Sequence, residues 1–395
     1  MSLVVRYSAL LQLPGVRRAL TASIIGRLSI AMTGLSTLLL VSGQTGSYAT
    51  AGAVSGAFSL AFSVGAPYVA RVADRRGPIG VLRLCSVLHP IALIGLGIAA
   101  RGGAPTAVLL LTGALAGVSF PPIGSVMRAL WGTVTHGRQL VTAYSLESVA
   151  VEVSFVSGPA LVGLVVLLAS PFVALLLSAG MALVGGIGLT TSSAVRAVRP
   201  HPGSVHSATG PLASAAVRSL LLTVFFLGVA FGALEVGVPA FAEQESHRAA
   251  AGLLLALWSL GSMVGGLIYG GVHLSAPAIR QLPWLIGALA VTALLPVLAP
   301  NLWLMGAAVF IFGSSIAPFF SANSLLLGFE APPGTTTEAF AWGTSMIFGG
   351  AAVGAALAGY LVQNQSVPLA LSVTAVAGTL TLASGLAGRR RLSTG

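Results

Sequence analysis

Long apolar segments follow one another along almost the whole chain, and short polar segments separate them. A bilayer core of about 30 Å requires about 20 mainly apolar residues per helix, and Gly or Pro is tolerated where neighbouring helices satisfy the freed backbone groups. On this basis we predict twelve membrane-spanning helices. They cover approximately residues 19–41, 48–70, 79–100, 105–127, 140–168, 171–193, 217–241, 249–271, 281–299, 302–326, 338–362 and 367–387.

The composition supports a protein dissolved in lipid. Only 7% of the residues are charged and 56% are hydrophobic, whereas a soluble domain carries roughly a quarter charged residues. The one cysteine, Cys85, lies inside an apolar segment, so neither a disulfide framework nor a cysteine metal site is expected. We therefore expect an all-α integral membrane protein with no cofactor and no metal.

The arginines alternate between loops in a way that sets the orientation. With the N-terminus in the cytoplasm, only Arg101 and Arg248 face outside. The inner helix ends and loops then hold Arg6, Arg17, Arg18, Arg71, Arg75, Arg76, Arg83, Arg128, Arg138, Arg196, Arg199, Arg218, Arg280, Arg389, Arg390 and Arg391. Because cytoplasmic loops carry an excess of Arg and Lys, we expect both termini in the cytoplasm and a multi-pass protein of a bacterial inner membrane. The net charge of +11 is spread over these ends rather than gathered in one patch with aromatics, which excludes a nucleic-acid partner.

The chain divides in the middle and repeats itself. The longest polar stretch, RAVRPHPGSVHSATGP, separates the sixth span from the seventh, so we predict halves at 1–193 and 217–395 joined by a cytoplasmic linker at 194–216. A shift of 196 residues places GVSFPPI, from Gly117, over GSSIAPF, from Gly313, and also aligns Tyr144 with Phe340 and Gly158 with Gly354. A shift of 200 aligns the second span with the eighth. This spacing predicts two pseudo-symmetric six-helix halves.

The loop after the second span carries a familiar motif. The sequence from Ala70 to Pro78, ARVADRRGP, resembles the signature loop of the major facilitator superfamily, with Asp74, Arg75 and Gly77 in place and the basic pair after the glycine missing. The resemblance implies two halves around a membrane-normal axis, with a central site opened to one side at a time. It also makes Asp74 a candidate latch of the cytoplasmic gate, because an acid interacts with a positive helix end and a neighbouring Arg can bridge to the other half. The alternative is an ordinary solvated loop.

The fifth span holds Gly158, Pro159 and Gly163 in the segment VSFVSGPALVG. This looks like a degraded form of the Gly-Pro motif that superfamily antiporters carry in that helix. The resemblance implies an export-type helix, while ordinary close packing of Gly-rich helices is the alternative.

Four ionisable residues fall inside predicted spans, where such groups are costly and usually functional. Arg27 lies in the first span, Glu147 and Glu152 in the fifth, and Glu235 in the outer part of the seventh. Five helical residues turn Glu147 and Glu152 about 140° apart, so they point in different directions. We select Glu152 as the proton-carrying site, with a structural salt bridge to Arg27 as the alternative. Glu147 is expected to be structural, and Glu235 lines the cavity or lies at the outer interface.

The superfamily resemblance places several of the spans around a central cavity. Tyr144, Trp258, Asn323, Phe340 and Trp342 are candidates to line it with aromatic walls and few polar anchors.

Secondary active transport follows from these features. We predict proton-coupled efflux, by antiport and alternating access, of a small and fairly hydrophobic organic compound. Arg27 is the only base expected within the spans, which disfavours a sugar or organic-anion importer. Uptake by symport, or facilitated transport of a neutral metabolite, is the alternative. We expect protons and the bilayer as further partners, and a monomer.

An enzyme is not expected. The chain has no compact catalytic constellation, and it has no lysine for a phosphate-binding G-x-x-x-x-G-K-[ST] loop.

Overall fold

The computed structural model describes residues 3–198, 209–247, 250–272 and 276–392. Within these ranges the secondary structure is helical, and twelve segments are long and apolar enough to cross a membrane. The predicted all-α fold with twelve spans is therefore confirmed. Arg199, Arg248 and positions 199–208 of the predicted linker lie outside the described residues.

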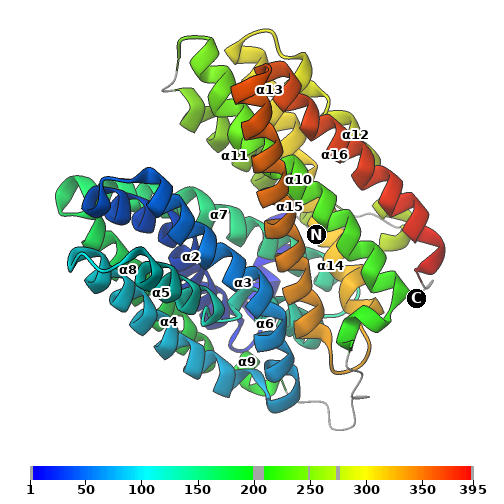
Figure 1. Cartoon of the computed structure of the whole chain (residues 1–395). Helices are drawn as coiled ribbons and strands as arrows, with labels where there is room; N and C mark the ends of the chain where they lie inside the picture. Colours follow the sequence, from blue (N-terminus) through cyan, green and yellow to red (C-terminus); the bar gives the residue numbers. More distant parts are fainter. Residues whose placement is uncertain (1–2, 199–208, 248–249, 273–275, 393–395) are drawn as a thin grey trace.

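The helices form two groups in chain order (Figure 1). The first consists of α2 (Val16–Thr45), α3 (Tyr48–Arg76), α4 (Pro78–Arg101), the pair α5 (Thr106–Val118) and α6 (Ile123–Val134), α7 (Arg138–Leu168) and α8 (Pro171–Thr190). The second consists of α10 (Ala215–Gln244), α11 (Ala250–Gly271), α12 (Ala278–Thr292) continued by η2 (Leu295–Leu298), the pair α13 (Leu302–Ser314) and α14 (Ile316–Glu330), α15 (Thr336–Asn364), and α16 (Val367–Gly388) continued by η3 (Arg389–Arg391). Short helices α1 (Leu3–Leu11), α9 (Ser193–Ala197) and η1 (Gly210–Ala213) lie outside the spans.

The fourth and tenth spans are each interrupted at an equivalent point. Ser119 is the C-cap of α5 and Ser315 the C-cap of α13, and these two serines are aligned by the shift of 196. Prolines follow in both cases: Pro122 is the N-cap of α6, and Pro318 lies in the first turn of α14. Proline has no backbone N–H to donate, so it fits a helix start better than a helix interior. Each span therefore consists of two helical pieces.

Helix packing inside the two groups follows the same plan. α2 packs against α7 and α8 as α10 packs against α15 and α16, and α3 packs against α5 as α11 packs against α13. Glycines allow close approach in these pairs: a Cβ added to Gly158 of α7 would lie 2.5 Å from the Cβ of Ala31 on α2, and one added to Gly354 of α15 would collide with the backbone of Val229 on α10. The repeat seen in the sequence thus recurs in the contacts.

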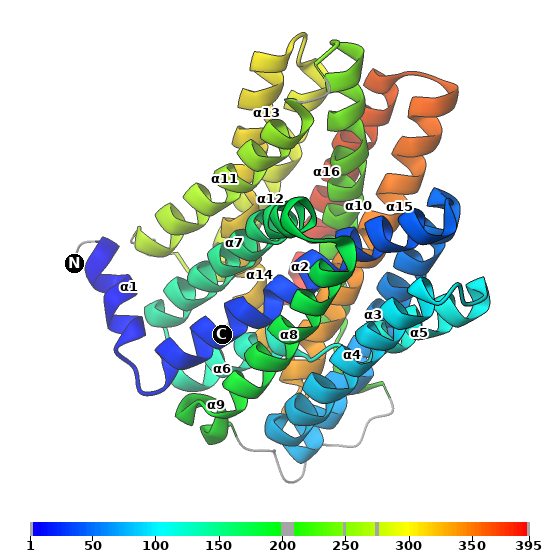
Figure 2. The same ribbon diagram turned by 90° about the vertical axis from the view of Figure 1, so that its left-hand side faces the viewer.

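We call the end of the molecule where α8 leads into α9, and η1 into α10, the linker end. The two groups meet there and diverge at the opposite end. Between the groups, α3 packs against α15, α7 packs against α11 and α14, and α6 packs against α15. The helix ends farther from the linker point apart in Figure 1, and the perpendicular view in Figure 2 shows α7 of the first group beside α11 and α14 of the second.

Candidate functional site

A cavity of about 300 Å³ lies between the two groups. Its lining comes from α2, α3, α6, α7, α10, α11, α14 and α15, together with the interruption between α5 and α6. No described lining residue belongs to α4, α8, α12 or α16. The third, sixth, ninth and twelfth spans are therefore peripheral, and every lining span has its repeat partner on the opposite wall.

A buried ion pair lies beside the cavity. The guanidinium of Arg27 donates through Nη2 to Oε1 of Glu147, and both side chains are almost fully buried, at 6% and 1% exposure. Trp131 Nε1 donates to the second carboxylate oxygen, Oε2, at 3.1 Å. Arg27 thus pairs with Glu147. The alternative considered for Glu152, a salt bridge with Arg27, is not found. Both oxygens of Glu147 are used, which is what a buried carboxylate requires.

Arg128 is a second guanidinium at the cavity, and it was not among the residues predicted to lie there. The fourth span was expected to end at residue 127, which placed Arg128 at an inner helix end. In the structure α6 continues to Val134, and Arg128 lines the cavity within electrostatic reach of Arg27 and Glu147. The expectation that Arg27 is the only base within the spans is therefore wrong. The available signal was the Pro121-Pro122 pair, which permits a restart of the helix and an extension beyond the arginine.

Glu152 and Glu235 also line the cavity, at other places. Glu152 projects from α7 toward α11 of the other group, where it lies beside Ser259 and Ser262. Glu147 turns instead to α2 and α6 of its own group, so the two carboxylates diverge. Glu235 of α10 is exposed on the cavity wall. Both groups of helices thus contribute a carboxylate to the cavity.

Aromatic rings form most of the remaining wall. Trp258 packs edge-to-face on Phe231, with ring centroids 5.0 Å apart, and both line the cavity with Phe340. Asn323 lies among them, 3% exposed, and its amide oxygen has no hydrogen-bond partner in the structure. Trp342 was predicted to line the cavity. In the structure it packs on the buried apolar core and is absent from the described cavity lining.

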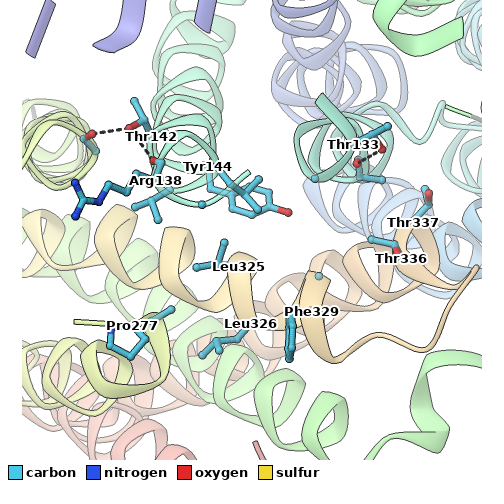
Figure 3. Close-up of a pocket in the computed structure, with 18 of the residues that line it drawn as sticks. Thr133, Arg138, Thr142, Tyr144, Pro277, Leu325, Leu326, Phe329, Thr336 and Thr337 are labelled. Atoms are coloured by element: carbon cyan, nitrogen blue, oxygen red, sulfur yellow. Dashed lines mark hydrogen bonds between the residues drawn. The ribbon is translucent and has the colours of Figure 1, made fainter. Parts of the chain in front are cut away.

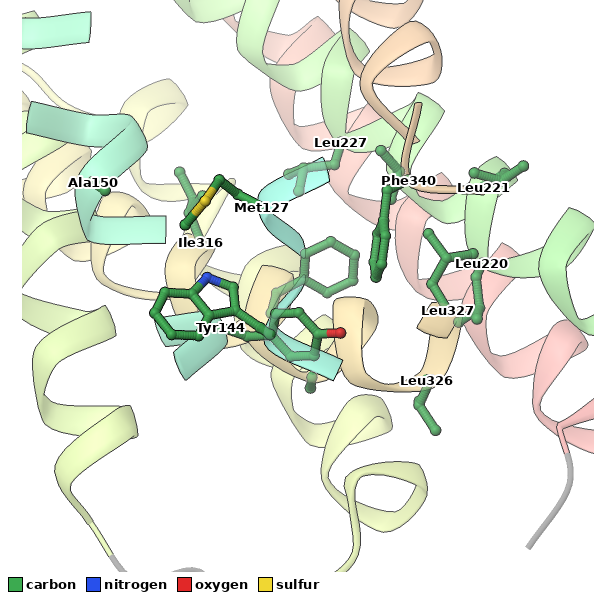
Figure 4. Close-up of a cluster of buried hydrophobic side chains, with 14 of the residues drawn as sticks. Met127, Tyr144, Ala150, Leu220, Leu221, Leu227, Ile316, Leu326, Leu327 and Phe340 are labelled. Carbon is green, nitrogen blue, oxygen red and sulfur yellow. The ribbon is translucent and has the colours of Figure 1, made fainter. Parts of the chain in front are cut away.

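Tyr144 was also predicted to line the cavity, but it lies in the layer that closes the cavity. Its ring packs on Phe340, with centroids 6.0 Å apart, and its hydroxyl donates to the carbonyl of Arg128 at 3.3 Å. Phe340 faces the central cavity, whereas Tyr144 faces a second pocket of about 1120 Å³ at the linker end (Figure 3). Leu327, Leu227 and other apolar side chains surround the two rings (Figure 4). The repeat aligns Tyr144 with Phe340, so two equivalent aromatics form one apolar layer between the pockets.

The signature loop contributes a latch at the linker end. The carboxylate of Asp74 accepts hydrogen bonds from the backbone N–H groups of Thr337 at 3.1 Å and Glu338 at 2.8 Å. These are free donors of the first turn of α15, in the other group, and an anion there also interacts with the positive end of the helix.

The bridging arginine of this latch is Arg71. Its Nε and Nη2 atoms donate to the two oxygens of Glu338 at 2.9 and 2.6 Å. Arg75, the motif residue, is exposed. Gly77 joins α3 to α4 with φ of 87°, a conformation that favours glycine. Asp74 therefore contacts the other group directly, and Arg71, not Arg75, is the arginine that bridges to that group.

Other hydrogen bonds close the linker end beside α7. Thr142 Oγ1 donates to the carbonyl of Gly270 at 2.9 Å, and the Ser145 and Ser321 hydroxyls are 3.1 Å apart. The hydroxyl of Tyr7, on α1, donates to the carbonyl of Leu267 at 3.1 Å. Burial raises the pKa of Tyr7 to about 12, so its hydroxyl remains a donor at neutral pH. Together with the contacts of Asp74 and Arg71, these bonds join the two groups at the linker end.

The residues of the Gly-Pro segment of α7 lie in two different environments. Gly158 is buried against α2, as described above, whereas Pro159 and Gly163 are exposed on the outside of the helix. Pro159 does not end α7, which continues to Leu168. Of the three motif residues, only Gly158 is required by the packing.

Among the residues that the structure describes, no group of three or more His, Cys, Asp or Glu side chains is placed to hold a metal ion.

Comparisons with known proteins identify the fold. A sequence model of the Major Facilitator Superfamily matches residues 19–355. No curated protein matches the chain by sequence. A bacterial homologue of the iron transporter ferroportin, in an outward-facing state, superposes with a TM-score of 0.79 at 14% identity, over 94% of this chain and 98% of that one.

Two other solved structures have the same fold. The human organic anion transporter MFSD10 (TETRAN) gives a TM-score of 0.73 at 19% identity, over 95% of this chain and 99% of that one. The E. coli fucose:proton symporter FucP gives 0.71 at 12% identity, over 96% and 99%. At these identities the likeness shows the fold alone.

Proposed function

Because the chain belongs to the major facilitator superfamily, we propose that it is a proton-coupled secondary transporter that moves a small organic compound by alternating access. The single observation that carries the proposal is the central cavity, to which both groups contribute aromatic rings and a carboxylate and the first group contributes two guanidiniums. A cavity of this kind suits a partly apolar solute held by a few polar anchors.

The arrangement of contacts supports alternating access. The latch, the bonds beside α7 and the Tyr144–Phe340 layer all lie between the cavity and the linker end. Rocking the two groups about the cavity would break these contacts and bring the opposite ends together. We place the linker end and both termini in the cytoplasm, from the arginine distribution, so the present arrangement faces outward. The membrane that we propose is a bacterial inner membrane, and the unit is a monomer.

We assign the coupled proton to Glu152. Glu147 is already committed to Arg27 and Trp131, so a proton there would disrupt a buried pair. Glu152 faces serine hydroxyls of the opposite group, which will move relative to it when the groups rock. A carboxyl whose surroundings change between the two states can take up a proton on one side and release it on the other.

Export by proton antiport is the direction that we propose, as the Gly-Pro segment of α7 implies by resemblance. In antiport the proton and the substrate exclude one another from the cavity, so deprotonated Glu152 belongs to the substrate-bound state. Uptake by symport is the second candidate, and one observation favours it: Arg128 adds a positive charge to the cavity. A substrate that carries a negative charge would bind better when Glu152 is protonated, which is the linkage that symport needs.

Flux into proteoliposomes under an imposed pH gradient tests the proposal. Purified protein is reconstituted, and radiolabelled aromatic compounds of neutral, cationic and anionic charge are followed with and without the gradient. We expect the gradient to drive accumulation of at least one compound in the wild type, and only downhill exchange in Glu152→Gln. Equal gradient-driven flux in both proteins would remove Glu152 from the coupling, and flux that ignores the gradient in the wild type would refute proton coupling.

A further inference from the structure

We infer that the central cavity selects organic anions, with the acidic group of the substrate bound between Arg27 and Arg128 and its apolar part against the aromatic wall. This inference deepens the proposed transport function and rests on it, because it names the substrate class of the same cavity. By the linkage described above, an anionic substrate favours symport over antiport. It departs from the expectation that Arg27, as the only base within the spans, disfavours an organic anion.

The positive charge at this part of the cavity exceeds the negative charge. Arg27 and Arg128 supply two guanidiniums, while Glu147 supplies the carboxylate that lies within reach of both. The two oxygens of Glu147 are taken by Arg27 Nη2 and Trp131 Nε1. One carboxylate cannot neutralise two guanidiniums, so the local field favours a further anion.

Arg27 also has a side-chain donor without a hydrogen-bond partner among the described residues. It is 5% exposed and lines the cavity, and its Nη1 atom is buried without a hydrogen-bond partner in the structure. A buried donor left unpaired is costly, and a guanidinium presents several N–H groups in a planar fork that matches a carboxylate. Binding a carboxylate there would satisfy this atom and balance the second positive charge in one step.

The rest of the cavity sets the shape of the anion. The guanidiniums come from the first group of helices alone, since the repeat places Ser324 at the position equivalent to Arg128. The facing wall holds Trp258, Phe231 and Phe340. An occupant that satisfies both sides has an acidic head toward α2 and α6 and an apolar, preferably aromatic, body toward α10, α11 and α15.

Glu152 and Glu235 are compatible with an anionic substrate. Glu152 lies beside serines of α11, on the other side of α7 from Glu147, and Glu235 lies on the exposed wall of α10. Neither carboxylate forms an ion pair with Arg27 in the described structure. They restrict the site to an occupant with one compact acidic head, because a second negative charge would meet them.

Paired probes of equal shape test the inference by binding, without flux. Three carboxylates and their uncharged amides are used: benzoate and benzamide, 2-naphthoate and 2-naphthamide, and octanoate and octanamide. Binding to the full-length protein in lipid nanodiscs is measured by equilibrium dialysis, with empty nanodiscs as the partition control. We expect at least one carboxylate to bind about tenfold or more tighter than its amide, since the amide lacks the negative charge and the second accepting oxygen of a bidentate pair with a guanidinium.

Variants connect this preference to the two arginines. Arg128→Gln removes one charge and leaves the Arg27–Glu147 pair intact, so we expect the carboxylate-to-amide ratio to fall toward one. Arg128→Lys keeps the charge and should keep a preference for the carboxylate. Arg83→Gln, an exposed arginine of α4 outside the cavity, is the matched control and should match the wild type. Thermal unfolding confirms that each variant is folded.

The outcomes separate the inference from the proposed function. Three outcomes would overturn the inference: equal binding of acid and amide by the wild type, binding of neither, or an unchanged carboxylate-to-amide ratio in folded Arg128→Gln. The first two outcomes do not require any variant to fold. If a carboxylate binds selectively but its flux ignores a pH gradient, proton coupling fails and the anion site stands. If a neutral compound shows gradient-driven flux and no carboxylate is preferred, the anion site fails and proton coupling stands.

Discussion

At the scale of single residues, the carboxylates inside the helices differ in their neighbours. Glu147 is paired with Arg27, Glu338 with Arg71, and Glu152 lies beside two serines. The helical angle between Glu147 and Glu152 was enough to predict that they diverge. It could not tell which of them faces Arg27, because that depends on the rotation of α7 against α2, which tertiary packing decides. Glu338 was not a candidate because nothing in its own segment reveals the arginine 267 positions away.

Removal of Glu147 is expected to destabilise the protein. Glu147→Ala leaves Arg27 buried without its partner, which costs about 3–5 kcal/mol in comparable buried pairs. Thermal unfolding in detergent, followed by tryptophan fluorescence, should show a clear drop in the midpoint. Glu243→Ala, at an exposed site near the end of α10, is the matched control. A midpoint for Glu147→Ala equal to that of this control would refute a structural role for the pair.

Removal of the charge of Asp74 is expected to loosen the linker end. A carboxylate at a helix N-terminus contributes about 0.3–1 kcal/mol, and up to about 2 in partly buried sites, so Asp74→Asn should increase the population in which this end is open. Spin labels at the exposed positions Arg76 and Phe329, in a Cys85→Ser background, report the distance between the groups. We expect a larger fraction of long distances in Asp74→Asn than in the wild type. The neighbouring exposed variant Arg75→Gln should have no effect, and a distance distribution unchanged by Asp74→Asn would contradict the latch.

At the scale of helices, apolar length located all twelve spans, but it misjudged the fourth. A count of apolar residues stops at the first charge, so Arg128 was assigned to a helix end. The interruption between Ser119 and Ile123 divides this span into α5 and α6 and carries the second piece on to Val134. The repeated segments GVSFPPI and GSSIAPF are the sites of both helix interruptions. The repeat shows that the two segments are equivalent, but it does not show that the helix is interrupted there.

Close approach of α7 to α2 should depend on Gly158. Gly158→Ala places a methyl group against Ala31, and overpacking of this kind costs about 1–3 kcal/mol. Gly163→Ala is the control in the same helix, because a Cβ there meets nothing within 4 Å. The expected result is a lowered unfolding midpoint for Gly158→Ala and no loss for Gly163→Ala. If both variants unfold at the wild-type temperature, the close contact of these helices is not important for stability.

At the scale of the whole molecule, the repeat accounts for the position of the closing layer. Tyr144 and Phe340 are aligned by the shift of 196 and pack on one another between the two pockets. The sequence predicted that both would lie near the centre, but it could not show that equivalent residues meet across the halves and exclude Tyr144 from the cavity. The charges break this symmetry, since both cavity arginines belong to the first group. A symmetric frame thus supports the rocking motion, and an asymmetric lining sets the substrate.

Proton movement driven by the substrate tests the central claim of coupling at Glu152 most directly. Proteoliposomes that contain the fluorescent pH indicator pyranine are loaded with a transported compound and diluted into compound-free buffer. In the wild type we predict that the internal pH changes as the compound leaves: it falls if protons enter by antiport, and it rises if protons leave with the compound by symport. The Glu152→Gln variant should release the compound without any change in internal pH. A wild-type protein that moves the compound with no pH change, or a Glu152→Gln variant that changes pH as the wild type does, would contradict the account.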